Sequence, residues 1–489
     1  MTDTLKDIQD LAAPMLREQA FVAGQWVSGS KDKKSVTNPA NGDLIGHVPC
    51  LTVQQVNGAV GAAKNSWPEW RAMRADERAS ILHCWDSLIR ENSESLAALM
   101  TLEQGKPINE AKGEIEYARS FIGWFAEEAK RQYGNVIPSH LDGSRLFVQR
   151  EPIGIVAAVT PWNFPCAMVT RKAAAAMAAG CPVIVVPSGH TPFSATALAL
   201  LAERAGVPAG IFSVLTGDSR EIVPVLCRSD DVRALSFTGS TEIGRLLIRE
   251  TAESVKKVSL ELGGHAPFIV FEDANLDDAV DGCINAKFAT SGQDCLGANR
   301  IYVHSDIYDE FADKFSEWTA TLRVGAGWDC GVDIGPLMHA SAVEKCDSHV
   351  ADALAKGATL LHEGGVKESG SLFYSPIVIG DVLESMQIYR DETFGPIAPL
   401  IRFDDNSEII GMANDTIYGL AAYIYTTDVA RGWKVADALE YGMVALNTPK
   451  MTGAPIPFGG YKQSGLGREG SQFGLDEFTE MKYFCWGGE

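Results

Sequence analysis

The sequence predicts an α/β protein with two doubly wound α/β domains and a small β element. At 489 residues the chain is too long for a single hydrophobic core. From residue 151 onward, short apolar runs alternate with amphipathic stretches, a pattern typical of parallel sheets covered by helices on both faces. Two extended stretches, around 135–150 and 475–487, fit neither domain and are candidates for pairing between subunits.

The N-terminal part is expected to be mostly helical. A short strand, a turn and another strand are indicated by "FVAGQWVSGS" and "NPANGDLIGHV". Residues 53–130 then carry apolar positions at helical spacing, as in "ERASILHCWDSLIREN". Strand character follows in "LFVQREPIGIVAAVTPWNFP", which ends in a loop bounded by two prolines.

The alternation of strands and helices forms two series. In the first, a helical stretch follows each of "CPVIVVPS", "FSVLTG" and "VRALSFTGS". The second begins after "KKVSLELGGHAPFIVF" and runs through "NRIYVHS", "APLIRF" and "AAYIYTT". We therefore expect a domain boundary near residue 258, with ligands bound beyond the carboxyl ends of the parallel strands.

Composition excludes several classes of partner. The formal charge is −21, from 42 basic and 63 acidic residues, which argues against nucleic acid and anionic membranes. The ten cysteines include no CxxC pair, so we expect no metal site and no disulfide framework, but reduced thiols in a cytoplasmic protein. The N-terminus does not resemble a signal peptide, and no apolar run is long enough to span a bilayer.

Four motifs carry possible chemistry, and each also has a structural interpretation. Cys295 in "FATSGQDCLGANR" is either a nucleophile or a small core residue. The turn "SFTGSTEIG" ends at Gly244 and offers free helix-start N–H groups to an anion, or is simply capped. Asn163 in "TPWNFP" is an oxyanion donor or a turn former. Glu261 in "SLELGGHAPF" is a general base or an ordinary strand residue.

Together these motifs resemble the aldehyde dehydrogenase superfamily. The resemblance covers nearly the whole chain, and the motifs occur in the family's order. They are "FVAGQWV", "NPANGDLIG", "EPIGIVAAVTPWNFP", "FTGSTEIG", "LELGGHAPFIV", "SGQDC", "DETFGPI", "NDTIYGL" and "PFGGYKQSGLGREG".

The resemblance implies a subunit of three parts. Residues 1–134 and 151–258 would form a Rossmann-like NAD(P)-binding domain, and residues 259–472 a catalytic domain. Residues 135–150 and 473–489 would form an oligomerisation element, which implies a homodimer or homotetramer.

The resemblance also assigns roles to residues. Cys295 matches the nucleophile, Glu261 the general base and Asn163 the oxyanion donor, with Lys172 near that asparagine. An aldehyde would be oxidised through a thiohemiacetal and a thioester, which water hydrolyses. The implied cofactor-binding residues are Trp162, Ser188, Gly239, Ser240, Gly244, Leu262, Glu392 and Phe394.

The chain departs from the family pattern where the adenosine ribose is expected. The usual "KPSE" turn reads "VPSG", with Val186 at the lysine position and Gly189 at the acidic one. Loss of the acid weakens discrimination against NADP, whereas loss of the lysine removes a cation that could meet a 2′-phosphate. The preference between NAD and NADP therefore stays open.

The substrate pattern also departs from the nearest-looking branch, the succinate-semialdehyde dehydrogenases. Arg171 matches an arginine that helps to bind the distal carboxylate, and Phe458 is a further candidate substrate contact. The branch's second arginine is Ala289 here, and Gly453 stands where a serine usually assists. Because a carboxylate normally needs several donors, a bulkier or less charged aldehyde is as compatible as a semialdehyde.

Two other functions remain open from the sequence. A CoA-acylating dehydrogenase would intercept the same thioester with a thiol, but that branch usually lacks the base that Glu261 matches. A catalytically inactive structural protein on this fold is the second alternative. The intact Cys295, Glu261 and Asn163 argue against it.

Overall fold

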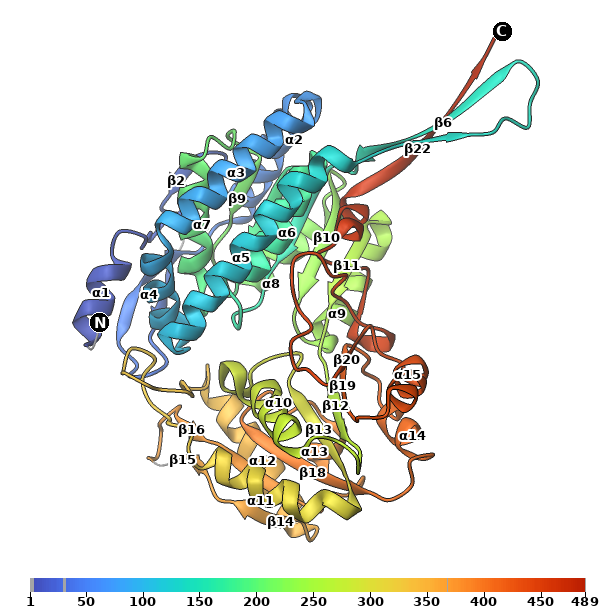
Figure 1. Cartoon of the computed structure of the whole chain (residues 1–489). Helices are drawn as coiled ribbons and strands as arrows, with labels where there is room; N and C mark the ends of the chain where they lie inside the picture. The colour runs from blue at the N-terminus through green and yellow to red at the C-terminus, as the bar shows by residue number, and fades with distance from the viewer. Residues whose placement is uncertain (1–3, 30–31, 367, 489) are drawn as a thin grey trace.

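The computed structural model describes residues 4–29, 32–366 and 368–488. An eight-stranded sheet forms the centre of the first α/β body (Figure 1). Its five inner strands are parallel, and antiparallel strands lie at both edges. In spatial order the strands are β2 (Gln25–Val27), β1 (Ala20–Val22), β9 (Phe212–Val214), β8 (Val183–Val186), β7 (Ile155–Val159), β10 (Val232–Thr238), β11 (Lys257–Glu261) and β21 (Gly465–Leu466).

Helices cover both faces of this sheet, because its apolar strands have no polar face. In β8, Val183 and Val185 pack into one core with helices α3 to α7. Ile184 and Val186 point to the opposite face, towards α2, α8 and α9, as the two-residue period of a strand requires. The helices of this body are α1 (Leu5–Ala12), α2 (Val53–Ala72), α3 (Ala75–Glu91), α4 (Ser93–Gln104), α5 (Ile108–Glu128), α6 (Ala167–Ala179), α7 (Pro192–Arg204), α8 (Ser219–Arg228) and α9 (Thr241–Thr251).

A seven-stranded sheet forms the second α/β body. All neighbouring pairs are parallel except that of edge strand β14 with β17. The order is β14 (Thr359–His362), β17 (Ile377–Gly380), β18 (Ile397–Phe403), β13 (Ala298–His304), β12 (Ala266–Val270), β19 (Ala421–Tyr425) and β20 (Met443–Leu446).

The helices of the second body also divide between two faces. Phe268 of β12 packs with α10 and α11, whereas its neighbour Ile269 packs with α12 to α15. These helices are α10 (Leu276–Phe288), α11 (Tyr308–Thr319), α12 (Ala340–Ala355), α13 (Gln387–Arg390), α14 (Ile409–Asn414) and α15 (Val429–Ala438). Short 3-10 helices connect the elements of both bodies: η1 (Ala129–Arg131), η2 (Ala252–Ser254), η3 (Ala289–Gly292), η4 (Ser305–Ile307), η5 (Lys462–Ser464) and η6 (Gln472–Phe478).

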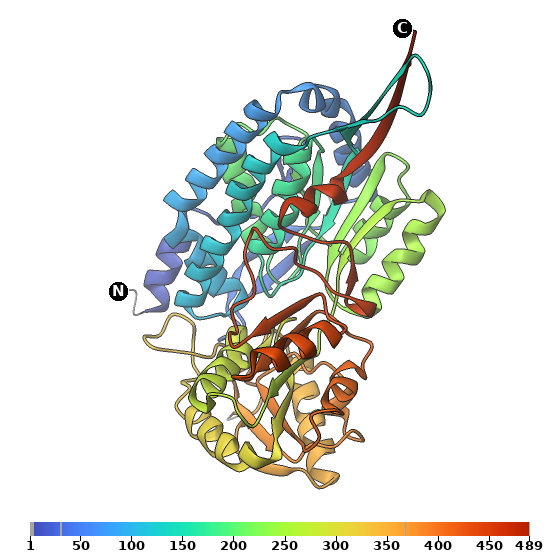
Figure 2. The same ribbon diagram turned by 45° about the vertical axis from the view of Figure 1, so that its right-hand side comes forward.

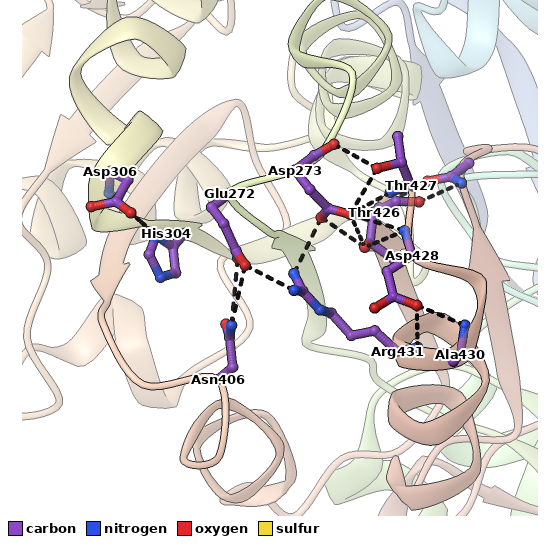
Figure 3. Close-up of polar contacts among 11 residues, drawn as sticks. Glu272, Asp273, His304, Asp306, Asn406, Thr426, Thr427, Asp428, Ala430 and Arg431 are labelled. Carbon is purple, nitrogen blue, oxygen red and sulfur yellow. Dashed lines mark hydrogen bonds and ion pairs between the residues drawn. The ribbon is translucent and has the colours of Figure 1, made fainter.

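A polar network joins the ends of two neighbouring strands in this body (Figure 3). Asp273, after β12, accepts hydrogen bonds from the backbone N–H groups of Thr427 and Asp428 at 3.0 and 2.9 Å. Arg431 of α15 places Nη1 3.2 Å from Asp273 and Nη2 2.8 Å from Glu272. Because the Asp273 carboxylate accepts from the backbone N–H groups of the turn that precedes α15, the network holds this helix against the sheet.

An antiparallel arm projects from the molecule (Figure 2). It contains β5 (Asn135–Ile137), β6 (Ser144–Pro152) and β22 (Thr479–Gly487), with β22 paired to β6 along its whole length. These strands come from the two stretches that the sequence predicts to be extended. Two small hairpins complete the chain: β3 (Lys33–Thr37) with β4 (Leu44–Pro49), and β15 (Gly365–Val366) with β16 (Tyr374–Ser375).

The predicted fold class, two α/β bodies with a small β element, is confirmed. The boundary expected near residue 258 falls inside β11, and β21 returns from the C-terminal part to close the first sheet. All ten cysteines are free in the structure. Within the described ranges, no helix has the length and apolar character needed to cross a membrane.

Candidate active site

A cavity of about 650 Å³ lies where the two bodies meet, and its wall takes residues from both. Most of the predicted site residues line it. Lys172, Ser188, Gly244 and Glu261 do not belong to the lining. Those that do are Trp162, Asn163, Arg171, Gly239, Ser240, Leu262, Cys295, Glu392, Phe394 and Phe458.

Cys295 lies in a tightly constrained turn on this wall. The preceding Thr290 and Ser291 have φ values of 51° and 58°, a left-handed conformation that costs energy for non-glycine residues. A side chain at Gly264 would collide with the Cys295 carbonyl oxygen, so only glycine fits there. Burial, followed by the charge of Asp294, raises the pKa of the Cys295 thiol well above its ordinary value. The thiol is therefore protonated at neutral pH.

Asn163 faces the cysteine turn from the first body. The Asn163 side-chain Nδ2 donates to the Gln293 backbone carbonyl at 3.1 Å. The Asn163 backbone carbonyl accepts from Lys106 Nζ at 2.8 Å. Lys106 also forms a buried ion pair with Glu114 at 2.6 Å. The second oxygen of Glu114 accepts from the Cys166 backbone N–H at 2.9 Å, at the start of α6. Lys106 and Glu114 therefore hold the Asn163 loop in place.

Glu261 ends β11 and is 2% exposed. Neither of its carboxylate oxygens has a hydrogen-bond partner among the described residues. Burial and the charge of Glu469 raise the pKa of Glu261 well above its usual value. A buried carboxyl group with a raised pKa is suited to accept a proton near neutral pH.

Arg171 and Lys172 lie on α6 and share one carboxylate. Arg171 Nε is 2.6 Å from Glu469, and Lys172 contacts the other oxygen of the same group. Burial opposes ionisation of Glu469, but Lys172 and Arg171 lower its pKa below the usual value. Arg171 also lies over the Phe458 ring at 4.2 Å, while its Nη1 has no hydrogen-bond partner in the described part of the chain.

Ser240, Glu392, Trp162 and Phe394 also line the cavity. Ser240 caps α9 by accepting from the Ile243 N–H at 3.4 Å, and together with Gly239 it brings the start of this helix to the cavity wall. Glu392 accepts from the Gly264 N–H at 3.0 Å, and burial raises its pKa to about 7. The Trp162 and Phe394 rings meet edge to face with centroids 5.7 Å apart.

Gly244 and Ser188 do not line the cavity. A Cβ at Gly244 would lie 2.5 Å from Leu262 Cδ2, so the glycine lets α9 approach Leu262. Ser188 lies in the turn after β8, where its Oγ accepts from the His190 N–H at 3.3 Å.

Lys34 fills the space beside Gly189 in the turn after β8. Its Cε lies 3.2 Å and its Cδ 3.5 Å from where a Cβ of residue 189 would lie. Lys34, Gly189 and His190 line a second cavity of about 710 Å³, and His339 lines both cavities. Sequence reasoning did not find Lys34, because nothing in the local pattern brings residue 34 to the end of β8.

Other functional candidates were also missed. Lys106, Glu110, Glu114, Asp294 and Glu469 are scattered over the chain and meet at this site only in three dimensions. Asp294 alone had a local signal, because it directly precedes Cys295.

Comparisons with known proteins agree with this geometry. Residues 26–484 match the aldehyde dehydrogenase family. The chain is 53% identical to the non-phosphorylating aspartate-semialdehyde dehydrogenase of Halomonas elongata, covering 97% of this chain and 96% of that protein. It is 52% identical to the NADP(+) succinate-semialdehyde dehydrogenase GabD of Escherichia coli, covering 97% and 98%. A crystal structure of an aldehyde dehydrogenase from Brucella melitensis biovar abortus has a TM-score of 0.96 at 51% identity, covering 97% and 98%.

The chain belongs to the aldehyde dehydrogenase family. It is an NAD(P)-dependent aldehyde dehydrogenase, which oxidises an aldehyde to the carboxylic acid, as the sequence predicts. The comparisons do not favour the CoA-acylating or the inactive structural alternative.

Glu114→Gln should strongly destabilise the protein. The variant leaves Lys106 buried without its counter-charge, a change that typically costs about 3–5 kcal/mol. Urea unfolding should show a clearly lower midpoint than the wild type. Glu116→Gln is the control, because Glu116 lies on the same helix with its side chain 59% exposed. Equal midpoints for both variants would contradict this account of the loop.

Proposed function

We propose that the protein oxidises a semialdehyde through a covalent intermediate on Cys295. One observation carries the choice of substrate: Arg171, 1% exposed, lines the same cavity as Cys295 and keeps its Nη1 unpaired among the described residues. A carboxylate at the far end of an aldehyde can accept from that nitrogen. The names of the relatives, aspartate- and succinate-semialdehyde dehydrogenase, support the same class of substrate.

The residues present fit NAD or NADP. The free N–H groups at the start of α9, capped by Ser240, suit a pyrophosphate, and the buried carboxyl group of Glu392 suits ribose hydroxyls. A Cβ at Gly263 would lie 2.9 Å from Glu392 Oε2, so glycine leaves that carboxylate open. We assign Trp162, Ser188, Gly239, Ser240, Gly244, Leu262, Glu392 and Phe394 to the cofactor site.

Cys295 attacks the aldehyde carbon, and the carbonyl oxygen becomes an oxyanion. The thiol proton must leave first, and since burial raises the pKa of this thiol, the reactive fraction grows with pH. Asn163 Nδ2 and the Cys295 backbone N–H donate to the oxyanion. Removing one such donor typically costs about 3–4 kcal/mol.

The bound nicotinamide of NAD or NADP supplies the hydride acceptor, and a thioester remains on Cys295. Glu261 takes a proton from water, the resulting hydroxide attacks the thioester carbon, and the acid leaves with Cys295 restored. Because the pKa of Glu261 is raised, its basic form increases as the pH rises. Hydrolysis should therefore accelerate with pH until Glu261 is fully ionised.

Variants should separate the two steps. Cys295→Ala should reduce kcat about 1,000-fold or more, because no thioester can form. Glu261→Gln should still release about one equivalent of reduced nicotinamide per active site in a burst, and then turn over slowly. Intact-mass spectrometry of this variant should show the acyl adduct.

Cys283→Ala is the matched control, since Cys283 is a buried packing residue of α10 and should not be needed for activity. Wild-type turnover by Cys295→Ala, or a Glu261→Gln protein without burst and adduct, would refute the assignment.

We also propose that Lys34 equips the cofactor site for NADP. In doubly wound sheets, an acid at a strand end binds the ribose hydroxyls of NAD, and a cation there accommodates a 2′-phosphate. The turn after β8 has no acid, and Lys34, which has no ion-pair partner among the described residues, fills its place. Arg220 chiefly, and Lys34 in addition, lowers the pKa of Asp218 after β9 to about 2. The positive field of Lys34 therefore reaches the ends of both β8 and β9.

Lys34→Ala should raise the Kd for NADPH about tenfold and leave that for NADH nearly unchanged, since one charge-assisted contact to the phosphate is lost. Isothermal titration of the apoenzyme measures both values without turnover. Lys33→Ala removes the same charge from the opposite face of β3 and should change neither. Equal effects of the two variants would show that only overall charge matters.

The projecting arm supports assembly as a homodimer or homotetramer. Val136, Met481 and Trp486 are 78%, 74% and 72% exposed on it, an arrangement that suits burial against another subunit. The ten free cysteines support a cytoplasmic location, where thiols stay reduced.

A further inference from the structure

The second cavity, of about 710 Å³, presents an imidazole beside Lys34. His190 directly follows Gly189 in the turn after β8, and both residues line this cavity together with Lys34. The His190 backbone N–H donates to Ser188 Oγ at 3.3 Å, whereas neither ring nitrogen of His190 has a hydrogen-bond partner in the described part of the chain. The ring nitrogens are therefore available to a ligand in this cavity.

His339 lies against this imidazole and is itself fixed. The ring centroids of His190 and His339 are 5.7 Å apart. His339 caps α12, because its Nδ1 accepts from the Ala342 N–H at 3.1 Å. A ring nitrogen that accepts a hydrogen bond carries no proton, so the cap holds His339 in its neutral form. Of the two histidines, His190 is the one that is free to take up a proton.

The groups that act on His190 make its protonation unfavourable before a ligand binds. Partial burial, followed by the proximity of His339 and the charge of Lys34, lowers the pKa of His190. The ring is therefore neutral near pH 7. Among the described residues that line the cavity, the acid is Glu368. Asp218, after β9, is a further carboxylate on which the Lys34 charge acts.

A phosphate dianion bound beside Lys34 would reverse this situation. Two negative charges next to an imidazole favour its protonated form. The imidazolium of His190 would then add a second positive charge and a charge-assisted hydrogen bond to those of Lys34. NADP carries such a phosphate on the 2′-oxygen of its adenosine ribose, where NAD carries a hydroxyl group.

We propose that His190 is a specificity residue for NADP: it takes up a proton from solvent as the 2′-phosphate binds beside Lys34, so the preference for NADP over NAD grows as the pH falls. The inference rests on the proposed role of Lys34 in the cofactor site. Because the NADP complex holds a proton that the free protein lacks, the affinity for NADP rises as the pH falls towards the pKa of free His190. Binding of NAD involves no such proton.

Isothermal titration of the apoenzyme measures this proton directly. NADPH and NADH are each titrated in two buffers of different ionisation enthalpy, neither of them phosphate. A pH of about 7.5 is suitable, because the second pKa of a phosphate monoester is about 6 and the 2′-phosphate is then mainly a dianion. The difference between the two cofactors cancels groups at the nicotinamide end, such as Glu392, that respond to both.

The proteins compared are the wild type, His190→Gln and His83→Gln. Glutamine keeps a hydrogen-bond donor at position 190 but does not titrate in this range. His83 is the matched control, because its side chain is 45% exposed on α3 and lines neither cavity.

The wild type should take up about half a proton more with NADPH than with NADH, and its Kd for NADPH should fall about fivefold to tenfold from about pH 8 to about pH 6.5. His190→Gln should lose the extra proton and most of this pH dependence, while its Kd for NADH stays the same. His83→Gln should behave as the wild type.

NADPH binding that depends on Lys34 but takes up no more protons than NADH binding would overturn this inference alone. An extra proton that His190→Gln retains would do the same, because the proton would then reside on another group. A Lys34→Ala protein with an unchanged Kd for NADPH would instead overturn the proposed role of Lys34, and this inference with it.

Discussion

The carboxylate of Glu469, held between Arg171 and Lys172, is the interaction on which the rest of the site depends. Glu469 comes from the C-terminal segment and the two cations from α6, so the pairing joins parts of the chain almost 300 residues apart. Three charges at this depth are tolerable only because they are paired. The same segment exchanges two backbone hydrogen bonds of 2.8 Å with Phe458, which places that ring against Arg171. Glu469 therefore positions both Arg171 and Phe458, which line the cavity.

Burial also sets the reactivity of the site. It raises the pKa of Cys295 and Glu261 well above their ordinary values, and that of Glu110 and Glu392 to about 7. A protonated thiol is a weak nucleophile. The chemistry therefore depends on groups whose protonation is shifted by burial, which is one way in which enzymes tune side chains for acid–base work. The left-handed backbone conformation of Thr290 and Ser291 costs conformational energy. Such a conformation persists only where the contacts of the surrounding structure hold it in place.

At the proposed cofactor site, a charge that is missing from the local sequence is replaced by a residue from another part of the chain. Val186 and Gly189 remove the lysine and the acid that the family pattern has after β8. The small glycine leaves room that Lys34 fills from a hairpin about 150 residues earlier in the sequence.

The sequence by itself determined the fold class, the family, and the positions of Cys295, Asn163, Glu261 and Ser240, because continuous apolar strands, helix caps and motif order are local properties of the chain. In the structure Cys295, Asn163 and Ser240 line one cavity, while Glu261, Lys172, Ser188 and Gly244 lie outside its lining. Only the tertiary structure decided which charges are paired: Glu469 with Arg171, and Glu114 with Lys106. The position of Lys34 beside Gly189 was decided in the same way. Charge pairing depends on distances between side chains, and those distances are set by how the elements pack in three dimensions.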